Sequence, residues 1–161
     1  MRSSTLILGL GNPLRGDDGL GPRVIEELEQ RSLPDGVTAI DGGVGGLSLL
    51  RYLEDWERVL IIDVADVGLQ PGQFLRFTPQ EARLLENECS FSVHGAGLGE
   101  AIALGNALGR EMAEIVIYGL QPESLEWRQG LSPAVEAGLP ALMKAVLDES
   151  KGDNNAQDSG N

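Results

Sequence analysis

The run Val59-Leu60-Ile61-Ile62-Asp63 gives the strongest strand signal in the chain, because four consecutive aliphatic residues precede a carboxylate. Short, uninterrupted aliphatic runs are typical of strands that are buried on both faces of a parallel sheet. Residues Thr5–Gly9 and 115–118 show the same pattern, and residues 37–40 add a shorter strand. A further strand is predicted for residues 72–77, either at an edge of the sheet or antiparallel to its neighbour.

Helical segments separate these strands. Leu20, Val24 and Leu28 recur at a spacing of four with glutamates between them, which predicts an amphipathic helix capped by Asp17 or Asp18. Further helices are predicted for residues 47–53, 79–85, 94–108 and 133–149. This alternation predicts a single-domain α/β fold, a three-layer sandwich whose mostly parallel, five-stranded, twisted sheet has helices on both faces and right-handed connections.

The predicted domain spans residues 1–149. Residues 150–161 contain no large apolar side chain, so they bury too little to offset chain entropy and are predicted to form a disordered tail.

The net charge restricts the partners that this chain can bind. Twelve Lys and Arg residues stand against 25 Asp and Glu residues, which gives a formal charge of −13. Nucleic-acid binders gain much of their affinity from cations that neutralise phosphates, so we expect neither nucleic acid nor an anionic membrane as a partner. A metal ion or a cationic peptide suits this field better.

Cys89 is the only cysteine, which excludes an intrachain disulfide and a thiolate cage for zinc. The first apolar run, Leu6-Ile7-Leu8, is too short for a signal peptide or a membrane span. We therefore expect a cytoplasmic protein.

Candidate site residues follow the predicted strands at their carboxyl ends, where open α/β sheets bind ligands. Asp18 lies at the start of the first helix, where it either caps the helix or faces a cleft as a ligand. Asp63 ends the strongest strand, and either accepts hydrogen bonds from loop N–H groups or belongs to a site. His94, the only histidine, precedes a predicted helix. Two carboxylates and one imidazole suit a transition metal with open coordination positions, but spacing alone leaves their convergence open.

Other polar residues join this predicted acidic rim: Asn12, Asp17, Asp41 and Asp66.

Several common catalytic and nucleotide-binding signatures are missing or incomplete. Gly9-Leu10-Gly11 begins like a dinucleotide-binding loop, but Leu14 replaces its third glycine. The chain has no Walker loop, no His-Glu-x-x-His helix and no Gly-x-Ser-x-Gly elbow. Nothing supports Cys89 and His94 as a catalytic dyad. A cofactor-binding module that uses residues 9–11 remains a rival interpretation, although the adjacent aspartates would repel phosphates.

The motifs together resemble the [NiFe]-hydrogenase maturation endopeptidases over residues 5–147. The most specific stretch is residues 8–21, with Gly9-Leu10-Gly11-Asn12 and the acidic pair Asp17-Asp18, whose second acid is a metal ligand in that family. The other similar stretches are Asp41-Gly42-Gly43, residues 61–66, residues 68–72, residues 92–94, residues 119–123 and residues 131–135. The resemblance implies that Asp18, Asp63 and His94 form the metal-binding and catalytic set. Family members often carry Glu at the first of these positions and Gln after the histidine, where this chain has Gly95.

The family reaction is removal of a C-terminal extension from the hydrogenase large-subunit precursor after nickel insertion, with substrate-bound nickel as the recognition element. The resemblance thus implies a cytoplasmic peptidase, expected to be a monomer, whose partner is the nickel-loaded precursor and which holds no organic cofactor. Either an aspartate or the metal would activate the attacking water. A peptidyl-tRNA hydrolase is a second rival, but the catalytic histidine of that family is replaced here by Gly16-Asp17-Asp18.

Overall fold

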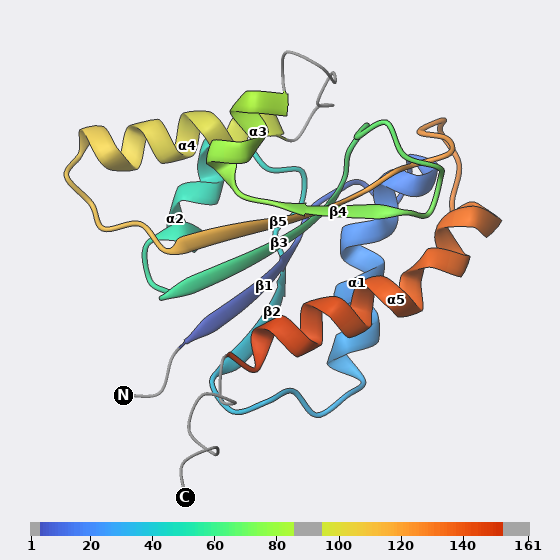
Figure 1. Cartoon of the computed structure of the whole chain (residues 1–161), viewed down its shortest axis with the longest axis horizontal. Helices are drawn as coiled ribbons and strands as arrows, with labels where there is room; N and C mark the ends of the chain where they lie inside the picture. Colours follow the sequence, from blue (N-terminus) through green and yellow to red (C-terminus); the bar gives the residue numbers. More distant parts are fainter. Residues whose placement is uncertain (1–3, 86–94, 153–161) are drawn as a thin grey trace, which may run out of the picture.

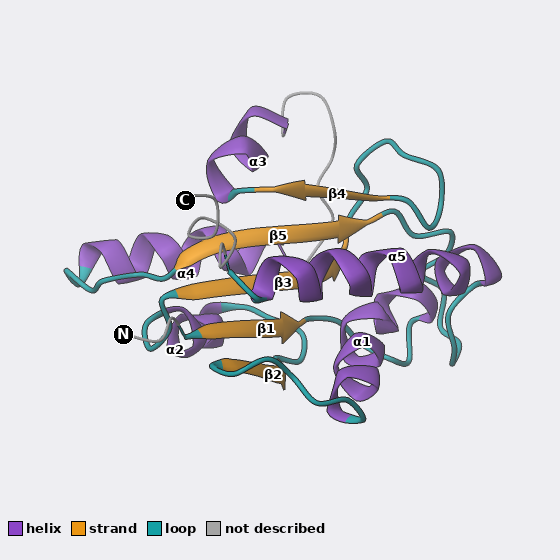
Figure 2. Cartoon of the chain, turned by 60° about the horizontal axis from the view of Figure 1, so that its bottom comes forward, coloured by secondary structure: helices purple, strands orange, loops and turns teal. Residues whose placement is uncertain are grey.

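The computed structural model describes residues 4–85 and 95–152, and within these residues the strands form one five-stranded sheet in the order β2-β1-β3-β5-β4. The strands are β1 Thr5–Gly9, β2 Val37–Asp41, β3 Arg58–Val64, β4 Phe74–Phe77 and β5 Glu114–Leu120. Strands β2, β1, β3 and β5 run parallel, while β4 pairs antiparallel with β5 at the edge (Figure 2). The predicted fold class and the edge position of the antiparallel strand are both confirmed.

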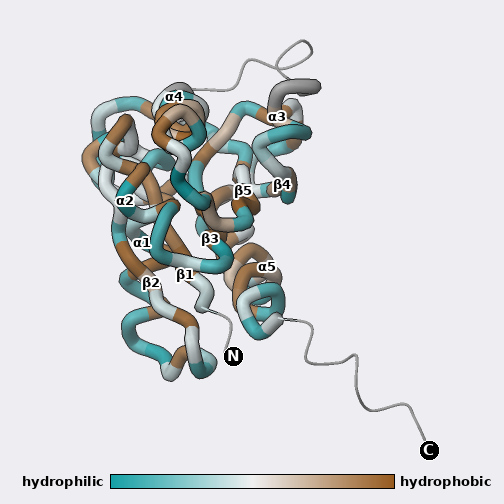
Figure 3. The backbone as a smooth tube through the Cα atoms, turned by 90° about the vertical axis from the view of Figure 1, so that its left-hand side faces the viewer, coloured by the Kyte–Doolittle hydropathy of each residue, from teal (hydrophilic) through white to brown (hydrophobic). Residues whose placement is uncertain are grey.

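Helices cover both faces of this sheet (Figure 1). One face carries α1 Leu20–Glu29 and α5 Pro133–Ser150, and the other carries α2 Leu50–Leu53, α3 Pro79–Leu85 and α4 Gly95–Ala107. Two 3₁₀ turns, η1 Gly16–Gly19 and η2 Leu47–Leu49, precede α1 and α2. Figure 3 shows the strands lying between α4 and α5, which is the arrangement of a three-layer sandwich.

The two faces of the sheet carry separate cores. Leu60 and Ile62 of β3 pack with α1 and α5, whereas Val59 and Ile61 pack with residues of α2 and α4. Successive side chains of a strand point to opposite faces, so a strand covered on both sides needs an aliphatic residue at every position. This double burial explains the continuous run that marks β3 in the sequence.

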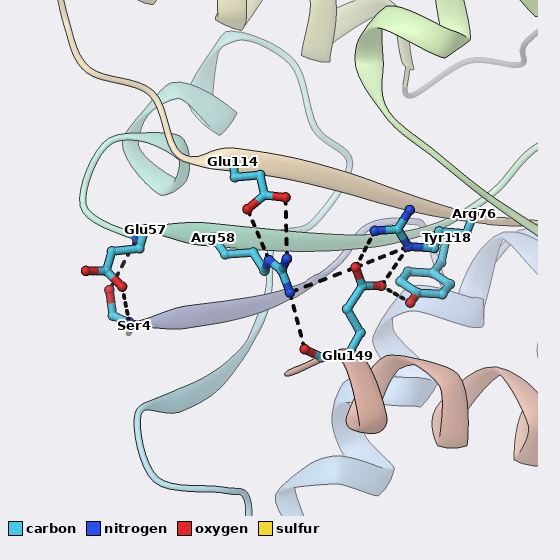
Figure 4. Close-up of polar contacts among 7 residues, drawn as sticks. All are labelled: Ser4, Glu57, Arg58, Arg76, Glu114, Tyr118 and Glu149. Atoms are coloured by element: carbon cyan, nitrogen blue, oxygen red, sulfur yellow. Dashed lines mark hydrogen bonds and ion pairs between the residues drawn. The ribbon is translucent and has the colours of Figure 1, made fainter. Parts of the chain in front are cut away.

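A polar cluster fastens the end of α5 to the sheet (Figure 4). The carboxylate of Glu149 accepts hydrogen bonds from the Tyr118 hydroxyl and from Nε of Arg76 at 2.9 Å. Nη1 of Arg58 donates to the backbone oxygen of Glu149 at 3.3 Å, and the same guanidinium pairs with Glu114 at 3.3 Å. Glu149 thus connects α5 to β3, β4 and β5.

The last helix extends to Ser150, which is 4% exposed, so the ordered fold includes the first residue of the predicted tail. Residues 153–161 lie outside the described part of the chain. None of the described helices is both long and apolar enough to cross a membrane.

Candidate active site

The parallel strands end side by side, which brings the loops that follow them to one edge of the sheet. Gly9 at the end of β1 is in register with Asp41 of β2 and with Ile62 of β3. The Leu10 N–H also donates a 2.9 Å hydrogen bond to the Ile62 oxygen, which holds the loop after β1 against the end of β3. Asp63, the next residue of β3, therefore shares this edge with the loop that contains Asp18. The predicted gathering of carboxylates at the carboxyl ends of the strands is present.

Asp18 is buried in the η1 turn, with 3% of its surface exposed. Its Oδ2 atom accepts a 2.9 Å hydrogen bond from the Asn12 N–H. Gly11 makes this close fold possible: its φ is +140°, and a Cβ added there would lie 1.8 Å from the Asp18 backbone oxygen. The loop after β1 thus wraps tightly around the Asp18 carboxylate and fixes its position.

The prediction that Asp17 or Asp18 caps the first helix is wrong. The N-cap residue of α1 is Gly19, and no side-chain cap bond is present there among the described residues. The physical reason is the preceding 3₁₀ turn, which places both aspartates one turn before the helix and directs their carboxylates to other N–H groups.

Asp63 is 7% exposed, and its Oδ1 atom accepts a 2.8 Å hydrogen bond from the N–H of Val64. Backbone hydrogen bonding, one of the two alternatives for this residue, is therefore part of its environment. Such a bond orients the carboxylate without excluding metal binding, because an ionised carboxylate has about four acceptor positions. The hydrogen bond from Val64 is observed, and the assignment of Asp63 to a functional site stays a prediction.

His94 and Cys89 lie outside the described residues, and helix α4 begins at the next described position, Gly95. Within the described residues, no group of three His, Cys, Asp or Glu side chains could hold a metal ion. Of the three predicted ligands, the described residues include Asp18 and Asp63, and the third, His94, lies outside them.

The start of α4 packs on the loop after β2. A Cβ added at Gly97 would lie 2.4 Å from the Cα atom of Gly46, so the two backbones are in direct contact. The same loop is joined to the loop after β1, because Gly11 donates a 2.8 Å hydrogen bond to the Gly43 oxygen. The first turn of α4 and the loop that surrounds Asp18 therefore adjoin one common loop.

Asp17 has a structural role that the sequence analysis missed. It is fully buried, and its carboxylate accepts hydrogen bonds from the N–H groups of Glu123 at 2.8 Å, Ser124 at 3.1 Å and Ser132 at 2.7 Å. The Ser132 hydroxyl donates a further bond at 2.9 Å. Asp17 thus holds the loop after β5 and the start of α5, while its neighbour Asp18 remains at the candidate site. No local signal reveals this, since the donors lie more than a hundred residues away in the sequence.

The remaining members of the predicted rim shape the loops. Asp41 is exposed, and its Oδ1 accepts a 2.9 Å bond from Gly43. Asp66 is exposed and accepts a 3.3 Å bond from the side-chain amide of Gln121. Gln121 in turn accepts a 2.9 Å bond from Val67, which ties the loop after β3 to the end of β5.

The backbone geometry argues against the cofactor-binding interpretation of residues 9–11. A phosphate-binding loop needs free N–H groups that point at the ligand. Here the N–H groups of Leu10, Gly11 and Asn12 donate to Ile62, Gly43 and Asp18 respectively. These three N–H groups are therefore used in hydrogen bonds within the protein and do not point at a phosphate.

Comparisons with known proteins identify the class of this chain. A sequence model of the family described as hydrogenase maturation protease matches residues 22–149, a span that includes Asp63 and begins after Asp18. The hydrogenase expression/formation protein HupD of Bradyrhizobium diazoefficiens is 39% identical over 132 residues, which are 81% of this chain and 69% of that protein.

Two solved structures share the fold. The hydrogenase maturating endopeptidase HybD from E. coli superposes with a TM-score of 0.79 at 33% identity, covering 91% of each chain. The [NiFe] hydrogenase maturation protease HybD from Thermococcus kodakarensis gives 0.74 at 28% identity, covering 92% of this chain and 99% of the other.

These matches define the chain as an enzyme, a peptidase with a single α/β domain. It belongs to the hydrogenase maturation protease family. Membership in that family also decides against a peptidyl-tRNA hydrolase.

Proposed function

We propose that this chain is the endopeptidase that removes the C-terminal extension of a [NiFe]-hydrogenase large-subunit precursor after nickel has been inserted. Its membership in the hydrogenase maturation protease family supports the reaction class and this kind of partner. The single observation that carries the proposal is the pair of buried carboxylates at the carboxyl edge of the sheet, Asp63 near the end of β3 and Asp18 in the loop after β1.

We further propose that nickel bound to the substrate is the recognition element. Asp18 and Asp63 supply two oxygen donors, and the family resemblance implies His94 as the third ligand. Three such ligands leave coordination positions for a metal that arrives on another chain, and imidazole and carboxylate donors are compatible with Ni²⁺. Burial of the carboxylates strengthens their attraction for a cation, because the local dielectric is lower than that of water.

Two routes can activate the attacking water in this arrangement. A carboxylate of Asp18 or Asp63 can remove a proton as a general base, or the substrate nickel can polarise the water or the scissile carbonyl as a Lewis acid. Both routes require the metal and the peptide bond to be presented together at this edge.

The test is a comparison of two forms of one purified precursor, one loaded with nickel and one free of it. Each is incubated with the wild-type chain, and the mass of the large subunit is measured over time. Loss of the C-terminal extension from the loaded form alone is the expected result. Equal cleavage of both forms would contradict recognition through nickel, and cleavage of neither would contradict the proposed reaction.

A further inference from the structure

Trp127 is exposed to an unusual degree for a large aromatic residue. At 74% it is the most exposed of the large hydrophobic side chains in the described part of the chain. The guanidinium carbon of Arg15 lies 5.4 Å from the centroid of its ring, which is a cation–π contact. Leu14, beside Arg15, is 51% exposed. We call Leu14, Arg15, Trp127 and Arg128 the Trp127 surface.

Backbone pairing makes the Trp127 surface one unit. Arg15 and Arg128 form a parallel bridge, in which the Arg128 N–H donates to the Leu14 oxygen at 3.0 Å and the Gly16 N–H donates to the Arg128 oxygen at 2.8 Å. The loop after β1 and the loop after β5 are therefore joined where the exposed side chains lie.

The Trp127 surface adjoins the loop that contains Asp18. The Asp18 N–H donates a 3.1 Å hydrogen bond to the Arg15 oxygen, so the loop that presents Arg15 is the one that holds the proposed ligand Asp18.

The two arginines of this surface lack the ion pairs that four other arginines form. Arg23, Arg58, Arg76 and Arg110 each pair with a glutamate. Neither Arg15 nor Arg128 forms an ion pair with a described residue, and Nε of Arg15 is buried without a hydrogen-bond partner. In a chain with a formal charge of −13, two cations without a described carboxylate partner lie beside an exposed indole, in a loop that also carries the exposed Glu126.

We infer that the Trp127 surface is the docking site for the precursor polypeptide, an inference that rests on the proposed function. An apolar side chain of the precursor packs on Trp127 and Leu14, and a carboxylate of the same segment pairs with Arg15 or Arg128. Trp and Arg are the residues most enriched among those that dominate the binding energy of protein interfaces. The surface binds the substrate, while Asp18 and Asp63 act at the scissile bond.

The kinetic test uses Trp127→Ala, Leu14→Ala and Arg15→Gln with nickel-loaded precursor. Substitution of a dominant interface residue raises KM about tenfold or more, with kcat nearly unchanged, if these residues only bind the substrate. Trp127→Phe, which keeps an aromatic face, should recover part of the loss. A KM within twofold of the wild-type value, about the scatter of such measurements, for both Trp127→Ala and Leu14→Ala would overturn the inference.

Two matched controls lie elsewhere on the molecule. Leu108, just after α4, is 55% exposed, so Leu108→Ala removes as much exposed apolar surface as Leu14→Ala. Arg51 stacks on Tyr52 at 4.7 Å, so Arg51→Gln removes a comparable cation–π contact. Both control variants should retain the wild-type KM.

A binding measurement separates failure of this inference from failure of the proposed reaction. The chain has two tryptophans, so Trp56→Phe leaves Trp127 as the only indole of this chain, and the emission of the precursor alone is subtracted. Titration of this variant with nickel-loaded precursor should shift Trp127 emission to shorter wavelength as the ring leaves water. An unchanged spectrum at precursor concentrations that support cleavage would overturn docking at Trp127, whereas a shift without any cleavage would keep the docking site and contradict the reaction.

Discussion

The backbone N–H of Ser132 donates a 2.7 Å hydrogen bond to the buried carboxylate of Asp17, although 115 residues separate the two in the sequence. Ser132 is also the N-cap residue of α5, and its hydroxyl accepts a 3.4 Å bond from Val135. One carboxylate therefore fixes both the start of the last helix and the loop that carries Trp127. Asp18, the next residue, is held in place relative to these elements by the same turn.

Asp17→Ala should lower the free energy of unfolding by about 2–4 kcal/mol, because the N–H and O–H groups that it satisfies would remain buried without an acceptor. Denaturant unfolding followed by circular dichroism measures the change. Asp66→Ala is the matched control, since that aspartate is exposed and its loss should cost less than about 1 kcal/mol. Equal losses in the two variants would contradict the structural role of Asp17.

The sequence predicted the layers of the fold better than the partners of its polar residues. The buried strands were recognisable because a strand covered on both faces must be aliphatic at each position, as residues 59–62 are. The role of Asp17 was not predictable, since its partners Glu123 and Ser132 come close only after the sheet has formed. The local sequence predicted that Asp17 or Asp18 caps the first helix, but the 3₁₀ turn before α1 places both residues ahead of the N-cap position.

The site was predicted in part. Parallel strands end at a common edge, so the placement of Asp18 and Asp63 followed from the fold class. Their burial and the tight loop around Asp18 did not, because these depend on the approach of Gly11 to the backbone of Asp18. The assignment of His94 stays a prediction, as it lies outside the described residues.

Asp18→Asn and Asp63→Asn should each reduce processing of nickel-loaded precursor by about a hundredfold or more, since each removes a charged ligand or general base and keeps the side-chain volume. His94→Ala should do the same. The readout is the rate at which the large subunit loses its extension, with circular dichroism to verify the fold. Asp41→Asn changes an exposed carboxylate at the same edge and should cleave at nearly the wild-type rate. Full activity of the first three variants would refute the assigned site.

Glu149 should make the stability of the fold sensitive to acid. Burial raises the pKa of its carboxyl, but hydrogen bonds from Arg76 and Tyr118 and the charges of Arg76 and Arg58 outweigh burial and hold this pKa below its usual value. Burial is the larger cause that raises the pKa of Tyr118, and the hydrogen bond to Glu149 raises it further. The Tyr118 hydroxyl therefore stays protonated and donates at neutral pH.

The unfolded chain therefore binds a proton at Glu149 at a higher pH than the folded chain does. The stability that ionised Glu149 contributes to the fold is complete above the unfolded pKa of about 4.3. It is lost as the pH falls through the lower pKa of the folded state. Glu149→Gln should be less stable than the wild type at pH 7, and the difference should shrink below about pH 4. Urea unfolding at several pH values measures it, and Glu26→Gln on the exposed side of α1 controls for the loss of one negative charge. A difference that stays constant down to pH 3, about one unit below the usual glutamate value, would disprove this linkage.

Two glycines of one helix should respond in opposite directions to the same substitution. Gly97→Ala places a Cβ 2.4 Å from the Cα of Gly46, a backbone atom that cannot rotate away, so α4 must shift from the loop after β2. We expect a loss of about 1–3 kcal/mol in unfolding free energy. Slower precursor cleavage should accompany it, because α4 directly follows His94.

Gly99 has no atom within 4 Å of an added Cβ, so Gly99→Ala should stabilise α4 by about 0.5–1 kcal/mol through helix propensity alone and leave cleavage unchanged. Thermal unfolding and cleavage rates of the pair decide the matter: if Gly97→Ala behaves like Gly99→Ala, the contact between α4 and the loop after β2 does not position the site.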